Sequence, residues 1–430
     1  MIIHVVQPGE TLSSIADYYG IPVGSVMEDN GLVEEDALVV GQSLVISKPK
    51  SIYTVKEGDT LGDIAAQSNI SFLQLLANNP FLSDREYLLS GDTLIINYEK
   101  KRALISHGYT SPSINSSTLQ KTLPYLTYLS IVNYTATMEG EIIYYYDETE
   151  IMQLSKTYSV VPLMFLTTLT MQGGANITID LDIILNEDFQ DRQIANILDI
   201  LKTKGYAGLN LSLQYISLSN IQYYDSYLKK VTNRLNDEGY EVFVTINPNI
   251  SQIYNEVSFQ RVDYSPINLL AENIIFMSYE WSQNINLPSP ISSIHNTELF
   301  LNFILNYIPP EKIIIGIATL GYDWELPYVS GISNVNILSF NNVIRLAMNN
   351  RANIQFDTVS QTPYFIYALN DYENHIVWFM DAQSINATLD LISKYGLAGI
   401  SIWNLTVFNP QLWLIINSQF DIIKITPDGA

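Results

Sequence analysis

Three apolar segments of this sequence end in side chains that could take part in chemistry. Polar groups at alternate positions of such a segment point to the same side when the segment forms a strand, so they can surround one reacting group. Amides and hydroxyls would form hydrogen bonds there, but of these groups only a carboxyl can protonate a leaving group. Aromatic side chains at the same edge offer apolar faces for packing. These side chains are Asn210, Ser212 and Gln214 in the first segment, Tyr279 and Glu280 in the second, and Trp403 in the third.

The composition is that of a folded, acidic protein with more than one domain. The 430 residues exceed the length of one ordinary domain, and 47% of them are hydrophobic, including 29 tyrosines, which is enough for large cores. Acidic residues outnumber basic ones by 44 to 21, for a formal net charge of −23. That charge repels phosphate backbones and anionic lipid, so we expect neither nucleic acid nor a membrane as a partner.

We predict no metal and no cofactor. The chain has no cysteine, which excludes disulfides and thiolate metal sites, and its 4 histidines form no helical pair at metal-ligand spacing. The first residues lead directly into a structured repeat, without the basic segment and apolar core of a signal peptide. No uninterrupted apolar run reaches the length that spans a membrane. We therefore expect a soluble protein that the usual signal does not export.

The first 98 residues contain two copies of one short module. The segment from His4 to Ala16 recurs as Tyr53 to Ala65, and Asn30 and Asn79 hold the same relative position in the two copies. Each copy has the pattern of a strand, a glycine turn, two helices and a closing strand, with a threonine where a helix cap is expected. The sequence predicts two βααβ modules, over residues 1–48 and 51–98.

Both copies resemble the LysM family in the Gly-Asp/Glu-Thr-Leu motif, the Asn after the second helix and the closing Gly-Gln/Asp-x-Leu. LysM modules bind polymers that contain N-acetylglucosamine, such as peptidoglycan or chitin. The resemblance implies a groove in each copy, in which backbone amides meet the acetamide and small apolar groups meet its methyl. The same residues could instead only shape the turn and core. The groove residues are Gly9, Glu10, Thr11, Leu12, Asn30 and Gly31 in the first copy and Gly58, Asp59, Thr60, Leu61, Asn79 and Pro80 in the second.

Residues 102–430 alternate short β-branched and aromatic segments with helix-like stretches. Near-continuous apolar strands separated by helices indicate a parallel sheet covered on both faces. Eight such units predict an α/β fold, the (β/α)8 TIM barrel. The widest gap, at about residues 321–382, predicts a small α+β insertion with two paired strands, Tyr364–Tyr367 and His375–Phe379. The eight predicted strands are Ala103–Tyr109, Tyr125–Asn133, Ser159–Leu166, Gly208–Gln214, Glu241–Asn247, Asn273–Glu280, Lys312–Ala318 and Gly399–Trp403.

Three strand ends of the predicted barrel resemble family-18 glycoside hydrolases. Gly205–Gln214 is similar to their fourth strand, Met277–Trp281 to their sixth-strand Met-x-Tyr-Asp motif, and Gly399–Trp403 to their eighth strand, whose Trp lies under a sugar. With two LysM modules in front, nearly the whole chain resembles the spore-cortex-lytic N-acetylglucosaminidases of the spore-germination group. The resemblance implies a sugar cleft at the carboxyl ends of the strands. Its binding residues would be Gln214, Tyr279, Glu280 and Trp403.

The fourth strand departs from the catalytic motif of that family. The motif is Asp-Gly-x-Asp-x-Asp-x-Glu, and its acidic positions are Ala207, Asn210, Ser212 and Gln214 in this chain. In the family the terminal Glu protonates the leaving oxygen, and the preceding Asp holds the substrate acetamide as it attacks. A general acid alone contributes about 10²–10⁴ in rate. We therefore predict that the barrel has no intact catalytic residues and does not hydrolyse glycans.

Three hypotheses about function remain open. The first is a binding or structural protein that attaches to peptidoglycan or the spore envelope. The second is an active N-acetylglucosaminidase with a relocated acid, with Glu280 as the first candidate and Asp323 and Glu325 as further carboxylates. The third is an assembly protein that has lost sugar affinity. The neutral motif argues against the second, and the intact LysM motifs argue against the third.

The cellular location follows only from the resemblance. It implies assembly from the mother-cell cytoplasm onto the spore surface, although an ordinary cytoplasmic protein would have the same sequence features. The oligomeric state and the identity of the glycan stay open at this stage.

Overall fold

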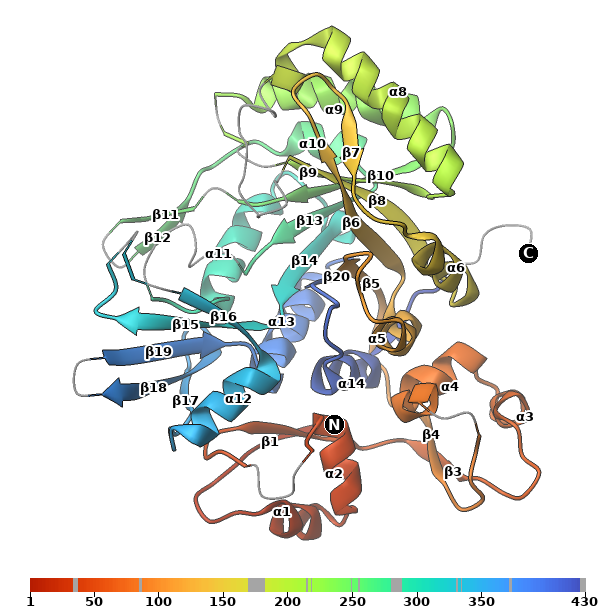
Figure 1. Ribbon diagram of the computed structural model, residues 1–430, viewed down its shortest axis with the longest axis vertical. Helices are drawn as coiled ribbons and strands as arrows, with labels where there is room; N and C mark the ends of the chain where they lie inside the picture. Colours follow the sequence, from red (N-terminus) through yellow and green to blue (C-terminus); the bar gives the residue numbers. More distant parts are fainter. Residues whose placement is uncertain are drawn as a thin grey trace.

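The computed structural model has a central barrel, two small modules against one side of it and a separate sheet that extends from another side (Figure 1). No helix in the described part of the chain is long and apolar enough to cross a membrane. The described residues are 1–33, 38–84, 87–168, 182–213, 216–217, 219–248, 250–253, 256–279, 288–329, 332–333, 335–370 and 373–425.

Eight parallel strands close into a ring, which confirms the predicted TIM barrel. The pairing of the last strand with the first closes it, at Gly399 to Ile402. The strands are buried along most of their length, because helices cover the outside and side chains fill the inside. In order around the ring, they are β5 (Arg102–Thr110), β6 (Tyr128–Ala136), β8 (Val161–Thr167), β9 (Gly208–Leu213), β10 (Glu241–Ile246), β13 (Asn273–Met277), β14 (Ile313–Ala318) and β20 (Gly399–Trp403).

The predicted start of the second strand is wrong by three residues. Leu123–Tyr125 form a short 3-10 helix, η2, with Pro124 at its start, and β6 begins only at Tyr128. Proline fixes its own φ and has no N–H to donate to a neighbouring strand, so it favours the turn. The Lys424 ammonium donates to the carbonyls of Leu123 and Leu126, at 2.9 and 2.7 Å, and holds this turn from the far end of the chain.

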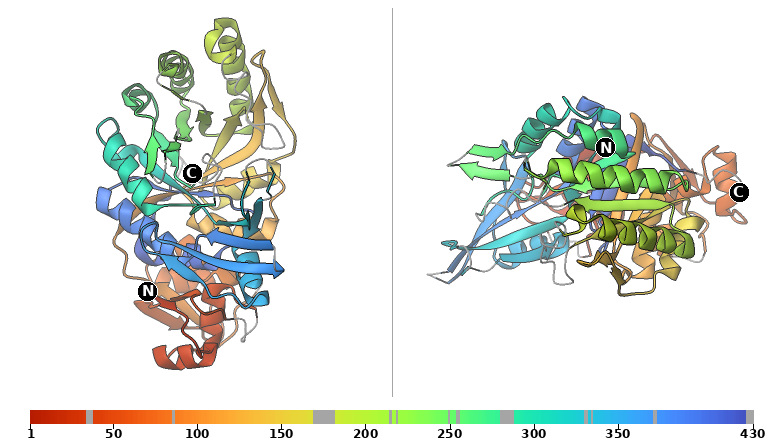
Figure 2. Two further views of the ribbon diagram at one scale, coloured as in Figure 1. Left: turned by 90° about the vertical axis from the view of Figure 1, so that its left-hand side faces the viewer. Right: turned by 90° about the horizontal axis from the view of Figure 1, so that it is seen from above.

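Helices alternate with the strands and cover the outside of the barrel (Figure 2). In α8, the Asn186 side chain caps the first free N–H groups and Gly205 ends the helix in the left-handed conformation. The barrel helices are α5 (Ser116–Thr122), α6 (Thr149–Thr157), α8 (Glu187–Lys204), α9 (Ile221–Asn236), α10 (Ser265–Leu270), α11 (Ile294–Ile304), α13 (Ala382–Tyr395) and α14 (Pro410–Gln419), with the short η4 (Pro310–Lys312). Smaller strands beside them are β7 (Ile142–Tyr144), β11 (Ile250–Ile253), β12 (Glu256–Phe259) and β21 (Phe420–Ile422).

A five-stranded antiparallel sheet and one helix lie between β14 and β20. Two of its strands pair through Tyr364 and Trp378, as the sequence predicts. One face of the sheet packs against its helix around Val343, Phe365 and Val377. The elements are β15 (Leu320–Leu326), β16 (Val335–Ser339), α12 (Phe340–Asn349), β17 (Gln355–Asp357), β18 (Thr362–Asn370) and β19 (Glu373–Phe379), and we call them the insertion.

Each N-terminal module folds as two helices beside a two-stranded antiparallel sheet, in the predicted βααβ order. Apolar residues spaced three and four apart in the helices form a small core under each sheet. The first module contains β1 (Ile2–Val5), α1 (Leu12–Tyr19), α2 (Val23–Asn30) and β2 (Ser43–Ile46). The second contains β3 (Ser51–Thr54), α3 (Leu61–Gln67), α4 (Phe72–Asn78), η1 (Pro80–Asp84) and β4 (Thr93–Asn97).

Both modules attach to the same barrel helix, α14, which lies between them and the strands in Figure 1. Gln411 donates to the Asn30 side chain and to the Ser43 carbonyl, at 2.9 Å each. Asn417, further along α14, donates to the Asn78 side chain at 2.8 Å. Because these groups are buried, the modules are packed parts of the body of the protein.

Candidate functional site

Asn210 lies inside the barrel in a hydrogen-bond network that carries no charge. It is fully buried on β9. Its amide nitrogen donates to the Ser130 hydroxyl at 2.9 Å, and its oxygen accepts from the Thr245 hydroxyl at 2.7 Å. The Tyr109 hydroxyl lies 2.7 Å from the same Thr245 oxygen. The amide is therefore satisfied by neutral groups from three other strands.

His107 extends this network across the barrel. Its two ring nitrogens lie 2.7 Å from the Ser401 hydroxyl and 2.8 Å from the Ser130 hydroxyl. Burial lowers the pKa of His107 to about 3, so the ring is neutral at physiological pH. Tyr109, which packs edge-on against His107 at 4.6 Å between ring centroids, has its pKa raised to about 12 by burial. At neutral pH, none of these groups carries charge.

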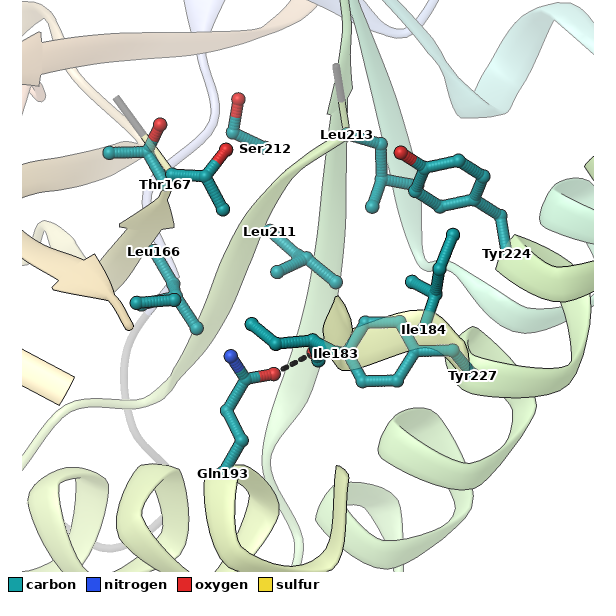
Figure 3. Close-up of a pocket in the computed structure, with 12 residues that line it drawn as sticks. Leu166, Thr167, Ile183, Ile184, Gln193, Leu211, Ser212, Leu213, Tyr224 and Tyr227 are labelled. Atoms are coloured by element: carbon teal, nitrogen blue, oxygen red, sulfur yellow. Dashed lines mark hydrogen bonds between the residues drawn. The ribbon is translucent and has the colours of Figure 1, made fainter. Parts of the chain in front are cut away.

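Ser212 lies at the carboxyl end of β9 and is almost fully buried. Figure 3 shows its hydroxyl turned away from Leu211 and Leu213, which point toward the covering helices. The cavity beneath these leucines has a volume of about 20 Å³, and the Tyr227 hydroxyl donates to the Gln193 side chain beside it. A space of that size holds about one water molecule. It is a packing cavity between strands and helices, and neither Tyr279 nor Trp403 lines it.

The other motif positions are only partly described. Ala207 is half-buried just before β9, where its backbone N–H donates to the Pro162 carbonyl at 3.0 Å. Gln214 and Glu280, at the ends of the fourth and sixth predicted strands, lie outside the described residues.

Tyr279 and Trp403 both lie at carboxyl ends of barrel strands, on either side of β14. Tyr279 is buried, and its hydroxyl lies 3.1 Å from the Met277 sulfur. Its ring lies over Gly316 of β14, where a Cβ would come within 3.2 Å of the ring. Trp403 is half-buried and packs against Tyr109, with 5.2 Å between ring centroids. Each aromatic ring is thus supported by the barrel interior at the edge where the cleft is predicted.

The carboxylate of Asp323 is used within the insertion. It is buried on β15, where it accepts hydrogen bonds from the Tyr367 hydroxyl at 3.0 Å and His375 Nδ1 at 2.9 Å. Burial and the neighbouring Asp323 charge raise the pKa of Tyr367 above its usual value. With two donors already bound, Asp323 is a structural carboxylate of the sheet. Glu325, two residues further along β15, is half-buried and also makes contacts.

The acidic residue in each LysM motif holds its own turn. Glu10 accepts from the Gln7 backbone N–H at 2.7 Å and lies 2.9 Å from His4 Nε2, and the backbone hydrogen bond and His4 lower its pKa. Asp59 repeats this pattern with the backbone N–H three residues earlier, at 2.8 Å, and with the Tyr53 hydroxyl at 2.9 Å. These carboxylates are engaged by the protein, so a ligand at the turn would meet mainly backbone groups.

The next two residues of each motif start the first helix of the module. Thr11 and Thr60 are helix caps, and each hydroxyl accepts from the backbone N–H three residues later at 3.1 Å. Leu12 is buried in the module core, whereas Leu61 is half-buried. The threonines are exposed and stay within reach of a ligand.

The asparagines of the predicted grooves connect the second helix of each module to its last strand. Asn30 accepts from the Val45 N–H at 2.6 Å, and its amide nitrogen donates to the Val45 carbonyl at 2.9 Å. Asn79 makes the equivalent pair with Ile95, at 2.7 and 2.8 Å. Both side chains are buried, with their hydrogen-bonding groups occupied by the fold.

The remaining predicted groove residues have different surroundings in the two modules. Gly9 and Gly58 are exposed, and their φ angles of 86° and 87° favour glycine at the turn. Gly31 faces the barrel, since a Cβ there would lie 3.1 Å from Pro410. Pro80 is half-buried at the start of η1. The first module therefore presents its turn to solvent and its α2 end to the barrel.

The partners of Asn210 were not predicted from the sequence. His107, Tyr109, Ser130, Thr245 and Ser401 come from four other strands, and nothing in their local sequence pairs them. The sequence feature that could have revealed them is that each is a polar or polar-tipped residue inside an otherwise apolar predicted strand. Because such groups need partners when buried, five of them in four barrel strands indicate a shared network.

Comparison with known proteins places these features in families. The model of glycosyl hydrolases family 18 matches residues 141–407, and the LysM domain model matches residues 4–47 and 53–97. The cortical fragment-lytic enzyme of Bacillus subtilis (strain 168) is 31% identical over 434 residues, which cover 99% of this chain and all of that protein. The protein of the same name from Bacillus anthracis is 28% identical over 427 residues, covering 97% of this chain and 98% of the relative.

Solved structures of similar proteins agree with this fold over the whole length. The Bacillus megaterium QM B1551 spore cortex-lytic enzyme SleL superposes with a TM-score of 0.80 at 30% identity, covering 99% of both chains. The Bacillus cereus spore cortex-lytic enzyme SleL does so with a TM-score of 0.79 at 27% identity, covering 98% of both chains. The resemblance to the spore-cortex-lytic group is confirmed.

Proposed function

The chain belongs to family 18 of the glycosyl hydrolases and carries two LysM domains, and on this premise we propose that it binds peptidoglycan without hydrolysing it. The glycan is one that contains N-acetylglucosamine, and the relatives named as cortex-lytic make the spore cortex the first candidate. The spore envelope is the corresponding location.

The neutral network around Asn210 carries this proposal. Hydrolysis in the family needs carboxyl groups along the fourth strand, and here that strand offers an amide and a hydroxyl at Asn210 and Ser212. The titratable rings of the network, His107 and Tyr109, are neutral at physiological pH, because burial lowers the pKa of His107 to about 3 and raises that of Tyr109 to about 12. A barrel interior built from neutral partners accommodates the loss of these acids without leaving a buried charge unpaired.

Sugar binding needs aromatic faces and hydrogen-bonding groups, and it does not need the carboxyl groups that hydrolysis requires. The half-buried ring of Trp403 at the carboxyl edge of the barrel suits the apolar face of a pyranose ring, while the buried ring of Tyr279 packs over Gly316 and shapes the same edge. The exposed turns at Gly9 and Gly58 offer backbone amides in both LysM modules. Since α14 holds the two modules in fixed positions, a long glycan that reaches both turns gains affinity from the second contact.

A paired assay tests the proposal. The full chain is incubated with purified peptidoglycan, and the bound fraction and the released reducing ends are measured in the same sample, with the Bacillus subtilis cortical fragment-lytic enzyme as the reference. We expect binding that strengthens with the length of N-acetylglucosamine oligomers, no binding to glucose oligomers of equal length, and no release. Release of reducing ends by the native chain would refute the proposal that it is inactive. If the chain does not bind peptidoglycan, the hypothesis of an assembly protein without sugar affinity remains.

A further inference from the structure

A cavity of about 190 Å³ lies between the first LysM module and the insertion. One wall is the turn that follows α2, at residues 31–33, and the other is one face of α12. The α12 residues follow helical spacing, so they form one continuous stripe along the helix. They are Phe340, Asn341, Ile344, Arg345 and Met348.

The docking of the module against the insertion fixes the two walls. The Ile354 N–H donates to the Val40 carbonyl at 2.9 Å, and Val39 is buried in the hydrophobic core of the insertion. Gly41 lies so close to this contact that a Cβ would come within 2.0 Å of the Ile354 carbonyl oxygen. The cavity is therefore preformed by packing between two domains that are far apart in the sequence.

The cavity combines apolar walls with hydrogen-bond donors. Val33 and Met348 are 86% and 38% exposed, so the mouth stays apolar and open. Arg345 is exposed and has no carboxylate partner among the described residues. Gln42 is buried, and its amide nitrogen has no hydrogen-bond partner among the residues that the structure describes. Because neither the guanidinium of Arg345 nor the amide nitrogen of Gln42 has an acceptor among the described residues, both favour an acceptor on a ligand.

We propose that this cavity binds the carboxylate-bearing substituent of a muramic acid residue, with the carboxylate on Arg345 and the apolar part of the substituent against Ile344 and Met348. The inference rests on the proposed function, because it assumes that the glycan is peptidoglycan. The volume is below the roughly 300–1,000 Å³ of sites that enclose whole small ligands, which suits a side group of a chain held elsewhere. Both the lactyl group and the peptide that extends it provide this chemistry.

Matched ligands show whether the carboxylate comes from the lactyl group or from the peptide. The full chain is titrated by calorimetry with three disaccharides: N,N′-diacetylchitobiose, N-acetylglucosaminyl-N-acetylmuramic acid, and the latter bearing a dipeptide. We expect the carboxylate-bearing disaccharides to bind about threefold to tenfold more tightly than diacetylchitobiose, as a charge-assisted contact provides. A gain with the lactyl form identifies its own carboxylate as the ligand, and a gain only with the dipeptide identifies the peptide carboxylates.

Two pairs of variants locate the effect. Arg345→Gln should remove the preference for carboxylates, while Arg351→Gln, which alters an exposed arginine outside the cavity, should leave it intact. Asn341→Trp should block the cavity, whereas Asn342→Trp, at the adjacent exposed position outside it, should not. Each exposed position tolerates a new side chain, so loss of folding does not confuse the comparison.

The other outcomes overturn the inference. A preference that survives in both Arg345→Gln and Asn341→Trp refutes this site. Equal affinity of the native chain for all three disaccharides, or a preference for the uncharged one, refutes the inference and leaves the proposed function standing. No binding of any disaccharide or of polymeric peptidoglycan refutes both.

Discussion

Gln411 of the last barrel helix donates a hydrogen bond to the side chain of Asn30 in the first LysM module, at 2.9 Å and across 381 positions of sequence. Both residues are buried. Asn30 is a residue of the predicted sugar groove, but its amide connects α2, β2 and α14. The LysM motif therefore contributes here to attaching the module to the barrel as well as to the fold of the module.

Removing this bond should loosen the first module. We expect Gln411→Ala to lower the free energy of unfolding by about 1–3 kcal/mol, because it leaves the Ser43 carbonyl without this partner and opens a space in a buried contact. Thermal unfolding of the full chain measures the effect. Gln67→Ala, at an exposed position on α3, is the matched control and should change stability by less than about 0.5 kcal/mol. Equal unfolding temperatures for the two variants would contradict the assigned role.

Placing a carboxyl group in the barrel interior should lower the free energy of unfolding. Asn210→Asp replaces the donor to Ser130 by an acceptor, in a site where every neighbour is neutral. Burial would raise the pKa of the new carboxyl, so its protonated form stabilises the fold at low pH and that contribution is lost as the pH rises above about 4. Urea unfolding at pH 5 and pH 8 should show a penalty that grows to about 3 kcal/mol at the higher pH. Asn233→Asp, on the exposed face of α9, should show no such trend.

Asp29 gives the native protein a pH dependence of its own. Burial raises the pKa of Asp29 to about 7, above the unfolded value of about 3.9. The folded state therefore holds this proton more tightly, and the resulting stability is present at low pH and lost as the pH rises from about 4 to 7. We expect Asp29→Asn to be more stable than the native chain by about 1 kcal/mol at pH 8, a value reduced for partial solvent screening, and equally stable at pH 4.

The control for this experiment is Glu238→Gln, at an exposed position whose charge is not among those that raise the pKa of Asp29. Chemical unfolding of the three proteins between pH 4 and pH 8 gives the comparison. If Glu238→Gln gains as much stability at pH 8 as Asp29→Asn, the effect comes from general charge repulsion in this acidic chain and Asp29 has no special part in it.

Hydrolysis should need two restored acids. We expect no reducing ends from the native chain or from Gln214→Glu, because the intermediate would still lack a charged partner for the acetamide. Ser212→Asp with Gln214→Glu should release product slowly from purified cortex fragments, at about 10²-fold or more below a cortex-lytic relative, since the neutral network around Asn210 remains. Binding of all variants to the same fragments is the control. Turnover by the native chain that Glu280→Gln abolishes would replace this account with a relocated acid.

The sequence by itself determined the features that local patterns carry. The repeated motif at His4 and Tyr53 predicted two βααβ modules, and eight apolar segments predicted the barrel, because a continuous apolar run is a local pattern that is typical of strands buried on both faces. The loss of acids at Asn210 and Ser212 was also visible, since chemical identity needs no coordinates. The second strand begins three residues later than predicted, where Pro124 and the distant Lys424 stabilise a turn.

The tertiary structure alone decided which groups meet. Asn210 finds its partners on other strands, Asn30 bonds with Gln411 of α14, and Arg345 of α12 shares a cavity with the turn after α2. Each of these relationships joins residues that are far apart in the chain. Their local sequences satisfy the same helix and strand preferences whether or not the contact forms. The barrel closes all eight strands at once and its outer helix positions both modules, so the neutral interior and the docked LysM domains are properties of the assembled packing.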